Sequence, residues 1–314
     1  MSALYVGIDG GGTRTRAVVA GEDLVVRGRG TTGPSNASRG ALAHVMEVIH
    51  EAFDDSLSAA GVGQAEIRGI CCGIAGVEAT GLRERLQRGL EKIFGDGRIQ
   101  VTSDARIALA GATEGPEGTP AIVLIAGTGA IAFGRNAKGE EARAGGWGPL
   151  LGDEGSGYAI AREGLMAVVR ELDGRGPATL LRTSVLSSEG VSSPAELLQK
   201  LHRADGSSEV AAFFSLVLDA ARQGDEPSRQ IFQRAGEELG LAVLTVVRKL
   251  GMEETHFPVA TVGGVFAAGE MILDPIRSVL GPVAPAARIG PAAYPPEIGA
   301  VRIAIAADAE PGPE

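Results

Sequence analysis

The sequence contains little cysteine, few aromatic residues and no long apolar run. Its two cysteines, Cys71 and Cys72, are adjacent, so they offer neither a disulfide framework nor the spacing of a metal site. Aromatic residues make up 4% of the chain, too few for the stacking platforms that bind single-stranded nucleic acid. No segment approaches the roughly 18 consecutive apolar residues of a membrane-spanning helix. We therefore expect a protein of a reducing compartment.

Positive charge is also scarce. The chain has 29 Lys and Arg against 39 Asp and Glu, a net charge of −10, which disfavours a phosphate-backbone partner. The first residues show no basic segment followed by an apolar one, so we expect no secretory signal. These features predict a cytoplasmic protein without a nucleic-acid or membrane partner. A charged small molecule is not excluded, because backbone amides can supply local positive potential.

Glycine, in contrast, is abundant, with 47 of the 314 residues, about twice the usual share of roughly 7%. No collagen-like period accompanies it, so we expect the excess in turns and at close backbone approaches. Hydrophobic residues make up 44% of the chain, enough for a sizeable core, and the length favours two domains.

Apolar runs and glycine turns predict an α/β chain of two halves with one plan. In each half, a strand, a glycine turn carrying a threonine and a second strand precede a set of helices. The expected strands cover residues 4–8, 15–20, 24–29, 67–74, 98–102, 121–126, 130–135, 143–146 and 259–262. The expected helices cover residues 41–60, 82–94, 156–172, 178–186, 194–202, 209–222, 225–250 and 296–308, with further helices opening at 103–104 and after 263–264. A composition break at 114–120 predicts a hinge between one lobe over 1–117 and another over 118–295.

Two glycine turns are candidate phosphate-binding sites. Asp9 is followed by Gly10, Gly11, Gly12 and Thr13 between two expected strands, and Gly127-Thr128-Gly129 takes the same place in the second half. Turns without Cβ atoms let backbone amides close on phosphate oxygens, and an aspartate carboxylate suits Mg²⁺ and its waters. The spacing fits neither the Walker pattern nor the dinucleotide fingerprint. Each turn, taken alone, is equally consistent with a plain glycine hairpin.

Three other segments are candidates for the remaining chemistry. Asp104 follows an expected strand, where it could act as general base or cap a helix. The segment 145–156 contains the single tryptophan, Trp147, which could contact a ligand or anchor the core. Its Asp153 and Glu154 could bind sugar hydroxyls or place charge at a helix N-terminus. Gly263-Gly264 could let a base or ribose lie on the backbone, or simply join a strand to a helix.

The sequence resembles the N-acetylglucosamine kinase branch of the sugar kinase, heat-shock chaperone and actin superfamily, within the BadF/BadG/BcrA/BcrD ATPase family. The resemblance runs through nearly the whole chain and is most specific in D-G-G-G-T-R-T at 9–15 and A-G-G-W-G-P-L-L-G-D-E-G-S-G at 144–157. It implies a two-lobed actin-like (ribonuclease H-like) fold, each lobe a mixed sheet flanked by helices, with a cleft between the lobes. It also implies that the helix over 296–308 returns to the first lobe, and that the protein is a homodimer.

The resemblance further implies roles for individual residues and the cofactors ATP and Mg²⁺. Asp9 would organise the metal ion, and Asp104 would activate the 6-hydroxyl of an amino sugar. The ATP phosphates would lie against Gly11, Gly12, Thr13, Gly127, Thr128 and Gly129, and the nucleoside against Gly263, Gly264 and Ala268. The amino sugar would contact Asn36, Gly145, Gly146, Trp147 and Asp153 in addition to Asp104.

Two features depart from the family pattern. Ala130 and Ile131 stand where relatives often have serine or asparagine, which bears on recognition of the sugar's N-acetyl group or on a phosphate contact. Cys71 and Cys72 lie in a strand-like run and do not match the cysteines that hold an iron–sulfur cluster in the activator members of the family. This second departure counts against an activator.

The leading hypothesis is an ATP-dependent kinase of N-acetylglucosamine or glucosamine. The same nucleotide turns would also serve an ATPase that drives a partner protein rather than phosphorylating a sugar. A third alternative is a sugar sensor without turnover, for which the chain offers neither a helix-turn-helix pattern nor a basic patch.

Overall fold

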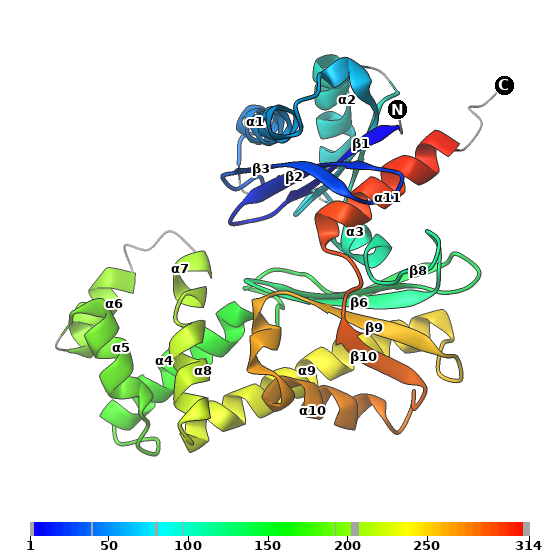
Figure 1. The fold of residues 1–314 in the computed structure, drawn as a ribbon. Coiled ribbons are helices and arrows are strands. Elements are labelled where there is room, and N and C mark those ends of the chain that lie inside the picture. The colour runs from blue at the N-terminus through cyan, green and yellow to red at the C-terminus, as the bar shows by residue number, and fades with distance from the viewer. Residues whose placement is uncertain are drawn as a thin grey trace. The chain divides into compact units, whose positions relative to one another are not determined.

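The computed structural model describes residues 3–38, 40–78, 81–95, 97–191, 193–201 and 207–309. The chain divides into two compact units (Figure 1). The first consists of Met1–Val123, Ala137–Gly139 and Pro291–Glu314, and the second of Leu124–Asn136 and Glu140–Gly290. The lobe limits expected at residues 117 and 295 stay predictions.

The first unit is built on a mixed five-stranded sheet in the order β3-β2-β1-β4-β5. β1 pairs antiparallel with β2 and parallel with β4, which is parallel to β5. The carboxyl ends of β1, β4 and β5 therefore meet at one edge of the sheet, where α/β proteins place functional side chains. The strands are β1 (Leu4–Gly10), β2 (Thr15–Gly21), β3 (Val26–Thr32), β4 (Ile67–Ile74) and β5 (Ile99–Thr102).

Helices cover both faces of this sheet (Figure 1). α1 (Leu42–Ala60) and α2 (Leu82–Phe94) pack on the face that carries Val6 and Ile8. α3 (Asp104–Ala110) and α11 (Pro296–Ala309) pack on the opposite face, which carries Tyr5. Close packing on this face requires glycine at position 7, since a Cβ there would lie 2.0 Å from the carbonyl oxygen of Glu297. A short 3₁₀ turn, η1 (Gln64–Glu66), precedes β4.

The second unit holds a mixed five-stranded sheet in the order β10-β9-β6-β7-β8 and most of the helices. Its strands are β6 (Ala121–Ala126), β7 (Ala130–Arg135), β8 (Glu141–Gly145), β9 (Phe257–Val262) and β10 (Ala287–Pro291). Its helices are α4 (Gly157–Leu172), α5 (Leu181–Glu189), α6 (Pro194–Leu201), α7 (Ser207–Ala211), α8 (Phe214–Arg222), α9 (Glu226–Leu250), the 3₁₀ helix η2 (Gly264–Ala268) and α10 (Glu270–Leu280).

These observations confirm the α/β class and most of the expected elements, with four differences. The single helix expected over 209–222 is two helices, α7 and α8, and the helix expected over 178–186 lies at Leu181–Glu189. The helix expected directly after Gly264 begins as the 3₁₀ helix η2. β10 was not expected, because its sequence contains arginine, glycine and proline and lacks an apolar run. Residue 202, the expected end of a helix, lies outside the described residues.

No helix within the described ranges is both long and apolar enough to cross a membrane.

Candidate active site

The first glycine turn joins β1 to β2 and leaves Asp9 at the end of β1. Asp9 lies opposite Arg16 in the antiparallel register, and its Oδ2 is 3.3 Å from Arg16 Nη1. The amide of Gly11 donates to the carbonyl of Arg14 at 3.0 Å, which closes the turn. Gly12 and Thr13 are exposed. The turn therefore leaves Gly12 and Thr13 exposed at the end of β1 that carries Asp9.

Some of the predicted ligand-binding glycines have no structural reason to be glycine. A Cβ on Gly12, Gly127 or Gly264 would have no heavy atom within 4 Å, and none of these residues has a positive φ. Gly10 is different, because a Cβ there would lie 2.4 Å from Ser35 Oγ. Close approach of a ligand to the backbone would explain why positions 12, 127 and 264 are glycine.

Gly12→Ala is therefore expected to weaken ADP binding by about tenfold or more, roughly 1.4 kcal/mol. The added methyl group would block backbone approach to a phosphate while leaving the fold unchanged or more stable by about 0.4–1 kcal/mol. Calorimetric titration with ADP and a thermal melt would measure both. Gly290→Ala is the matched control, because a Cβ there would also meet open space in β10, outside the predicted site. Equal ADP affinity in both variants would contradict a phosphate role for this turn.

Asn36 lies near the same edge of the sheet, next to the residues that follow β4. Gly76 has φ +74° and a Cβ there would be 2.6 Å from Asn36 Oδ1, so the two residues are in close contact. The Asn36 oxygen accepts hydrogen bonds from the Ser38 amide at 3.0 Å and the Ser38 hydroxyl at 2.7 Å. This arrangement fixes the amide orientation, and the Nδ2 group remains able to donate to a hydroxyl.

Asp104 is the first residue of α3, directly beyond β5. Ser103 is the N-cap, and its hydroxyl accepts the Arg106 amide at 3.2 Å. The alternative in which Asp104 caps the helix is therefore wrong. The carboxylate of Asp104 accepts the amide of Ala105 at 2.9 Å. Burial raises the pKa of Asp104, and the negative charge of Glu78 adds to the effect, which makes this carboxylate a stronger base than an exposed aspartate.

The electrostatics around Asp9 involve a residue that the sequence analysis missed. Burial, followed by the charge of Glu297, raises the pKa of Asp9 from 3.8 to about 7; Asp104 contributes in the same direction, and Arg16 opposes the shift. Glu297 lies in the first turn of α11 and is only 4% exposed. In a sequence, a glutamate at the start of a helix is most simply explained by its favourable interaction with the helix N-terminus. The residues around Glu297 therefore gave no indication that its side chain is buried.

The second unit brings the turn between β6 and β7 together with the segment 145–156. The amide of Gly157, at the start of α4, donates to the carbonyl of Gly127 at 2.7 Å. Asp153 Oδ1 accepts the Ala130 amide at 3.3 Å, and a Cβ on Gly129 would be 3.0 Å from Asp153 Oδ2. Asp153 is 6% exposed and has φ +62°, unusual for a residue with a side chain. Its carboxylate thus lies against the turn, and α4 is capped instead by Ser156.

Trp147 is exposed rather than part of the core. It is 64% exposed, and the guanidinium of Arg143 lies 4.8 Å from its ring centroid. The core-anchor alternative is therefore wrong. Gly145 and Gly146 next to it have φ of +79° and +73°, so the left-handed backbone by itself accounts for these two glycines. An exposed indole ring beside a glycine turn suits contact with a sugar face.

The predicted nucleoside segment also reaches the second glycine turn. Gly263 has φ +118° and a Cβ there would lie 2.3 Å from the carbonyl oxygen of Ala126. Gly264 begins η2 with open space beside it, and Ala268 is buried at the end of η2. The turn at 127–129, Asp153 and Gly263 are thus connected by direct contacts in this unit. In the first unit, the charges of Asp9 and Asp104 interact.

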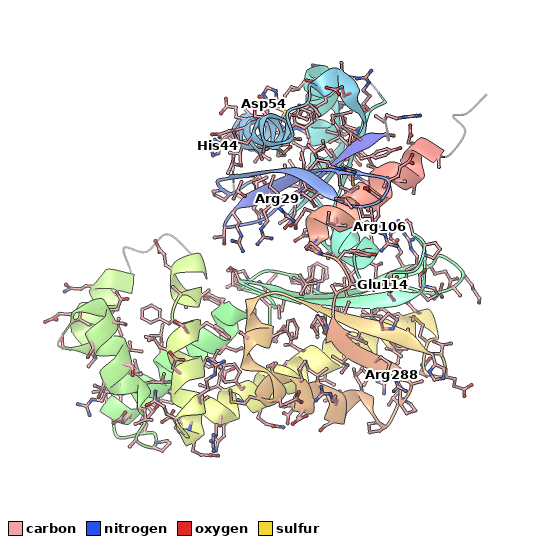
Figure 2. The ribbon with its side chains drawn as sticks, viewed as in Figure 1. Arg29, His44, Asp54, Arg106, Glu114 and Arg288 are labelled. Carbon is pink, nitrogen blue, oxygen red and sulfur yellow. The ribbon has the colours of Figure 1, made fainter. Side chains whose placement is uncertain are left out.

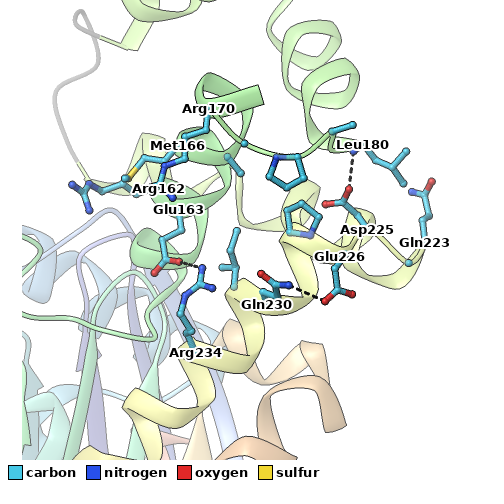
Figure 3. Close-up of a pocket in the computed structure, with 17 residues that line it drawn as sticks. Arg162, Glu163, Met166, Arg170, Leu180, Gln223, Asp225, Glu226, Gln230 and Arg234 are labelled. Carbon is cyan, nitrogen blue, oxygen red and sulfur yellow. Dashed lines mark hydrogen bonds and ion pairs between the residues drawn. The ribbon is translucent and has the colours of Figure 1, made fainter. Parts of the chain in front are cut away.

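A cavity of about 760 Å³ in the second unit contains none of the predicted residues (Figure 3). It lies among α4, the connection to α5, and the start of α9. Its acidic groups already have partners: Glu163 pairs with Arg234 at 2.6 Å, and Glu226 accepts from Gln230 at 2.9 Å. Asp225 caps α9 and accepts from Thr179 and Leu180. Each acidic side chain that lines the cavity therefore already has a partner, and none is free to act as a general base.

The residues of the first unit fit a magnesium ion bound with a nucleotide. No cluster of three His, Cys, Asp or Glu side chains arranged for a metal occurs in the described part of the chain. Mg²⁺, however, usually keeps several waters and takes only one or two carboxylates besides substrate phosphates. Asp9, partly buried and beside another carboxylate, is a donor of this kind.

The chain belongs to the BadF/BadG/BcrA/BcrD ATPase family, whose sequence profile matches residues 6–304. This confirms the resemblance found in the glycine-rich segments.

Two relatives and two solved structures are similar over nearly their whole lengths. The N-acetylmuramic acid/N-acetylglucosamine kinase of Clostridium acetobutylicum is 35% identical over 276 residues, covering 88% of this chain and 89% of the relative. The N-acetyl-D-glucosamine kinase of Dictyostelium discoideum is 28% identical, covering 96% and 98%. A Chromobacterium violaceum structure, described provisionally as an N-acetylglucosamine kinase, has a TM-score of 0.77 at 24% identity, covering 96% and 98%. A ROK family glucokinase from Streptomyces griseus has a TM-score of 0.63 at 19% identity, covering 96% and 99%. These two structures confirm the fold of actin-like sugar kinases.

Proposed function

We propose that this protein is an ATP-dependent hexosamine kinase that transfers the γ-phosphoryl group to the 6-hydroxyl of an amino sugar. The family and the kinase names of the two curated relatives support the enzyme class. The observation that supports the chemistry most directly is Asp104, a partly buried carboxylate of raised pKa beyond β5.

In this proposal Asp104 is the general base. The sugar O6 forms a bond to the γ-phosphorus, the bond from phosphorus to the β,γ-bridging oxygen breaks, and ADP leaves. The hydroxyl proton passes to the Asp104 carboxylate. Because phosphoryl transfer depends mainly on positioning and charge compensation, the remaining residues need only hold and orient the two substrates.

The phosphates are proposed to bind the backbone amides and hydroxyls of Gly11, Gly12 and Thr13 and of Gly127, Thr128 and Gly129. The open space beside Gly12 and Gly127 supports this assignment. Asp9 would hold Mg²⁺, which compensates phosphate charge when bound. Gly263, Gly264 and Ala268 would border the nucleoside. The contact between Gly263 and the turn at Gly127 supports placing base and phosphates next to each other.

The amino sugar is proposed to contact Asn36, Gly145, Gly146, Trp147 and Asp153. The exposed ring of Trp147 and the donor group of Asn36 support direct contact. Asp153 is already hydrogen-bonded to the backbone beside the second glycine turn. In addition to any contact with the sugar, this hydrogen bond connects the segment 145–156 to the second glycine turn. The homodimer and the cytoplasmic location stay predictions.

A sugar panel separates the proposed kinase from the other two hypotheses. ADP release coupled to a dehydrogenase assay would be measured with N-acetylglucosamine, glucosamine, N-acetylmuramate and glucose. We expect N-acetylglucosamine to give the highest kcat/KM, with glucosamine next. ATP hydrolysis that no sugar changes, without a sugar phosphate, would favour the partner-driving ATPase, which the relatives do not favour. Sugar binding without ADP release would indicate a sensor.

A further inference from the structure

The first turn of α11 places a buried carboxylate on the face of the sheet from which Asp9 projects. Gly7 and Asp9 are two residues apart on β1 and therefore face the same side of the sheet. The backbone of Glu297 lies directly against Gly7, where a Cβ would come within 2.0 Å of the Glu297 carbonyl oxygen. The start of α11 thus lies next to the predicted metal-binding end of β1.

The partners of the Glu297 carboxylate are incomplete. Its Oε1 is 3.4 Å from Nη1 of Arg29, whose side chain is 60% exposed. Arg29 is a residue of β3 and is labelled in Figure 2. The Oε2 of Glu297 is buried and has no hydrogen-bond partner among the described residues. A buried carboxylate oxygen without a donor is costly, so this oxygen calls for a donor that the surrounding side chains do not supply.

In its deprotonated form Asp9 cannot provide that donor, and it adds negative charge. The Asp9 carboxylate has its own ion pair with Arg16. The two carboxylates therefore favour a positive group between them that presents hydrogen-bond donors. A hydrated magnesium ion has both properties, since it keeps several of its waters when bound to one or two carboxylates.

We propose that Glu297 is a positioning residue for the magnesium ion of the nucleotide, with its Oε2 accepting a hydrogen bond from a water bound to the metal. This inference rests on the proposed use of Mg-ATP. Carboxylates that orient the ligands of a metal in this way commonly change metal affinity by about 10–100-fold when removed. Glu297 would thus act through the water and not touch the reacting atoms.

A purely structural role for Glu297 makes a different prediction. If its function were to hold α11 on β3 through Arg29, then Arg29→Gln should have the same effect as Glu297→Gln. If its function is to orient a magnesium-bound water, Arg29→Gln should leave metal binding unchanged. Arg29→Gln is therefore the matched control.

The experiment is calorimetric titration of the full chain with ADP, once in excess Mg²⁺ and once in EDTA. The ratio of the two affinities gives the magnesium-dependent gain. Glu297→Gln is expected to reduce this gain by about 10–100-fold, with ADP affinity in EDTA unchanged or higher because a negative charge is removed. Arg29→Gln is expected to keep the gain of the wild type.

An unchanged gain in Glu297→Gln, or an equal loss in Arg29→Gln, would overturn the inference while leaving the proposed kinase intact. Wild-type protein that binds no ADP in either condition would overturn the proposed function itself. If Glu297→Gln does not fold, as judged by circular dichroism, Glu297→Asp replaces it. The shorter side chain should also lose part of the gain, and an undiminished gain would again overturn the inference.

Discussion

Replacement of Asp104 by asparagine is expected to lower kcat by about 10²–10⁴-fold, the usual effect of removing a general base. Asparagine keeps the shape of the side chain and its bond to the Ala105 amide but cannot accept the substrate proton. Affinity for ATP should stay unchanged, since the phosphates are assigned to the glycine turns. Steady-state kinetics with N-acetylglucosamine and titration with ATP would measure the two quantities.

The pH dependence of the wild type gives an independent check of the same role. A general base must be deprotonated, and burial raises the pKa of Asp104. The acidic limb of kcat/KM is therefore expected above the value of about 4 that is typical of aspartate, with activity lost as the pH falls through it. Asp54→Asn, an exposed change on α1 (Figure 2), should leave both rate and profile unchanged. Near-native turnover by Asp104→Asn would refute the proposed mechanism.

Asp9→Asn is expected to make the nucleotide-free protein more stable at pH 8 and to abolish magnesium-dependent turnover. The pKa of Asp9 is raised from 3.8 to about 7, mainly by burial and by Glu297. Between these pH values the native carboxyl retains a proton that the unfolded aspartate has lost. Stability therefore falls as the pH rises from 3.8 to about 7. At roughly 1.4 kcal/mol per unit, the loss is at most about 4 kcal/mol.

Thermal melts at pH 5 and pH 8 would test this prediction. The gain from Asp9→Asn should be larger at pH 8, where the wild-type carboxylate is charged, and small at pH 5, where it is largely protonated. Glu51→Gln, a change at an exposed residue of α1, serves as the control, with similar small effects at both pH values. A variant that is less stable than the wild type by the same amount at both pH values would show that the Asp9 charge is not destabilising.

The proposed metal site would explain why the first unit keeps Asp9 and Glu297 although their charges lower its folding stability. Two carboxylates on one face of a sheet are unfavourable in the protein alone. If Mg²⁺ binds there with the nucleotide, as proposed, its charge would offset this repulsion, and the site would bind Mg-ATP more tightly than free ATP. Without nucleotide and metal, the two negative charges lower the stability of the folded protein, and such a loss is common at functional sites.

The sequence alone determined the elements whose signals are local. β4 and α2 begin and end where the apolar run and the helical period indicated, because side-chain periodicity depends only on neighbouring residues. The two glycine turns and the aspartate beyond β5 were found in the same way. The family resemblance added Asn36.

Only the tertiary structure decided which side chains meet across distant segments. The burial of Glu297 depends on α11 packing against Gly7, some 290 residues earlier in the chain. The contact of Asp153 with the second glycine turn and the exposure of Trp147 depend on the path of the segment 145–156. A residue type and its local spacing specify what a side chain can do. Strand order and helix packing decide whether that side chain is desolvated and which charged groups lie near it. Desolvation and neighbouring charges in turn determine the pKa of the side chain.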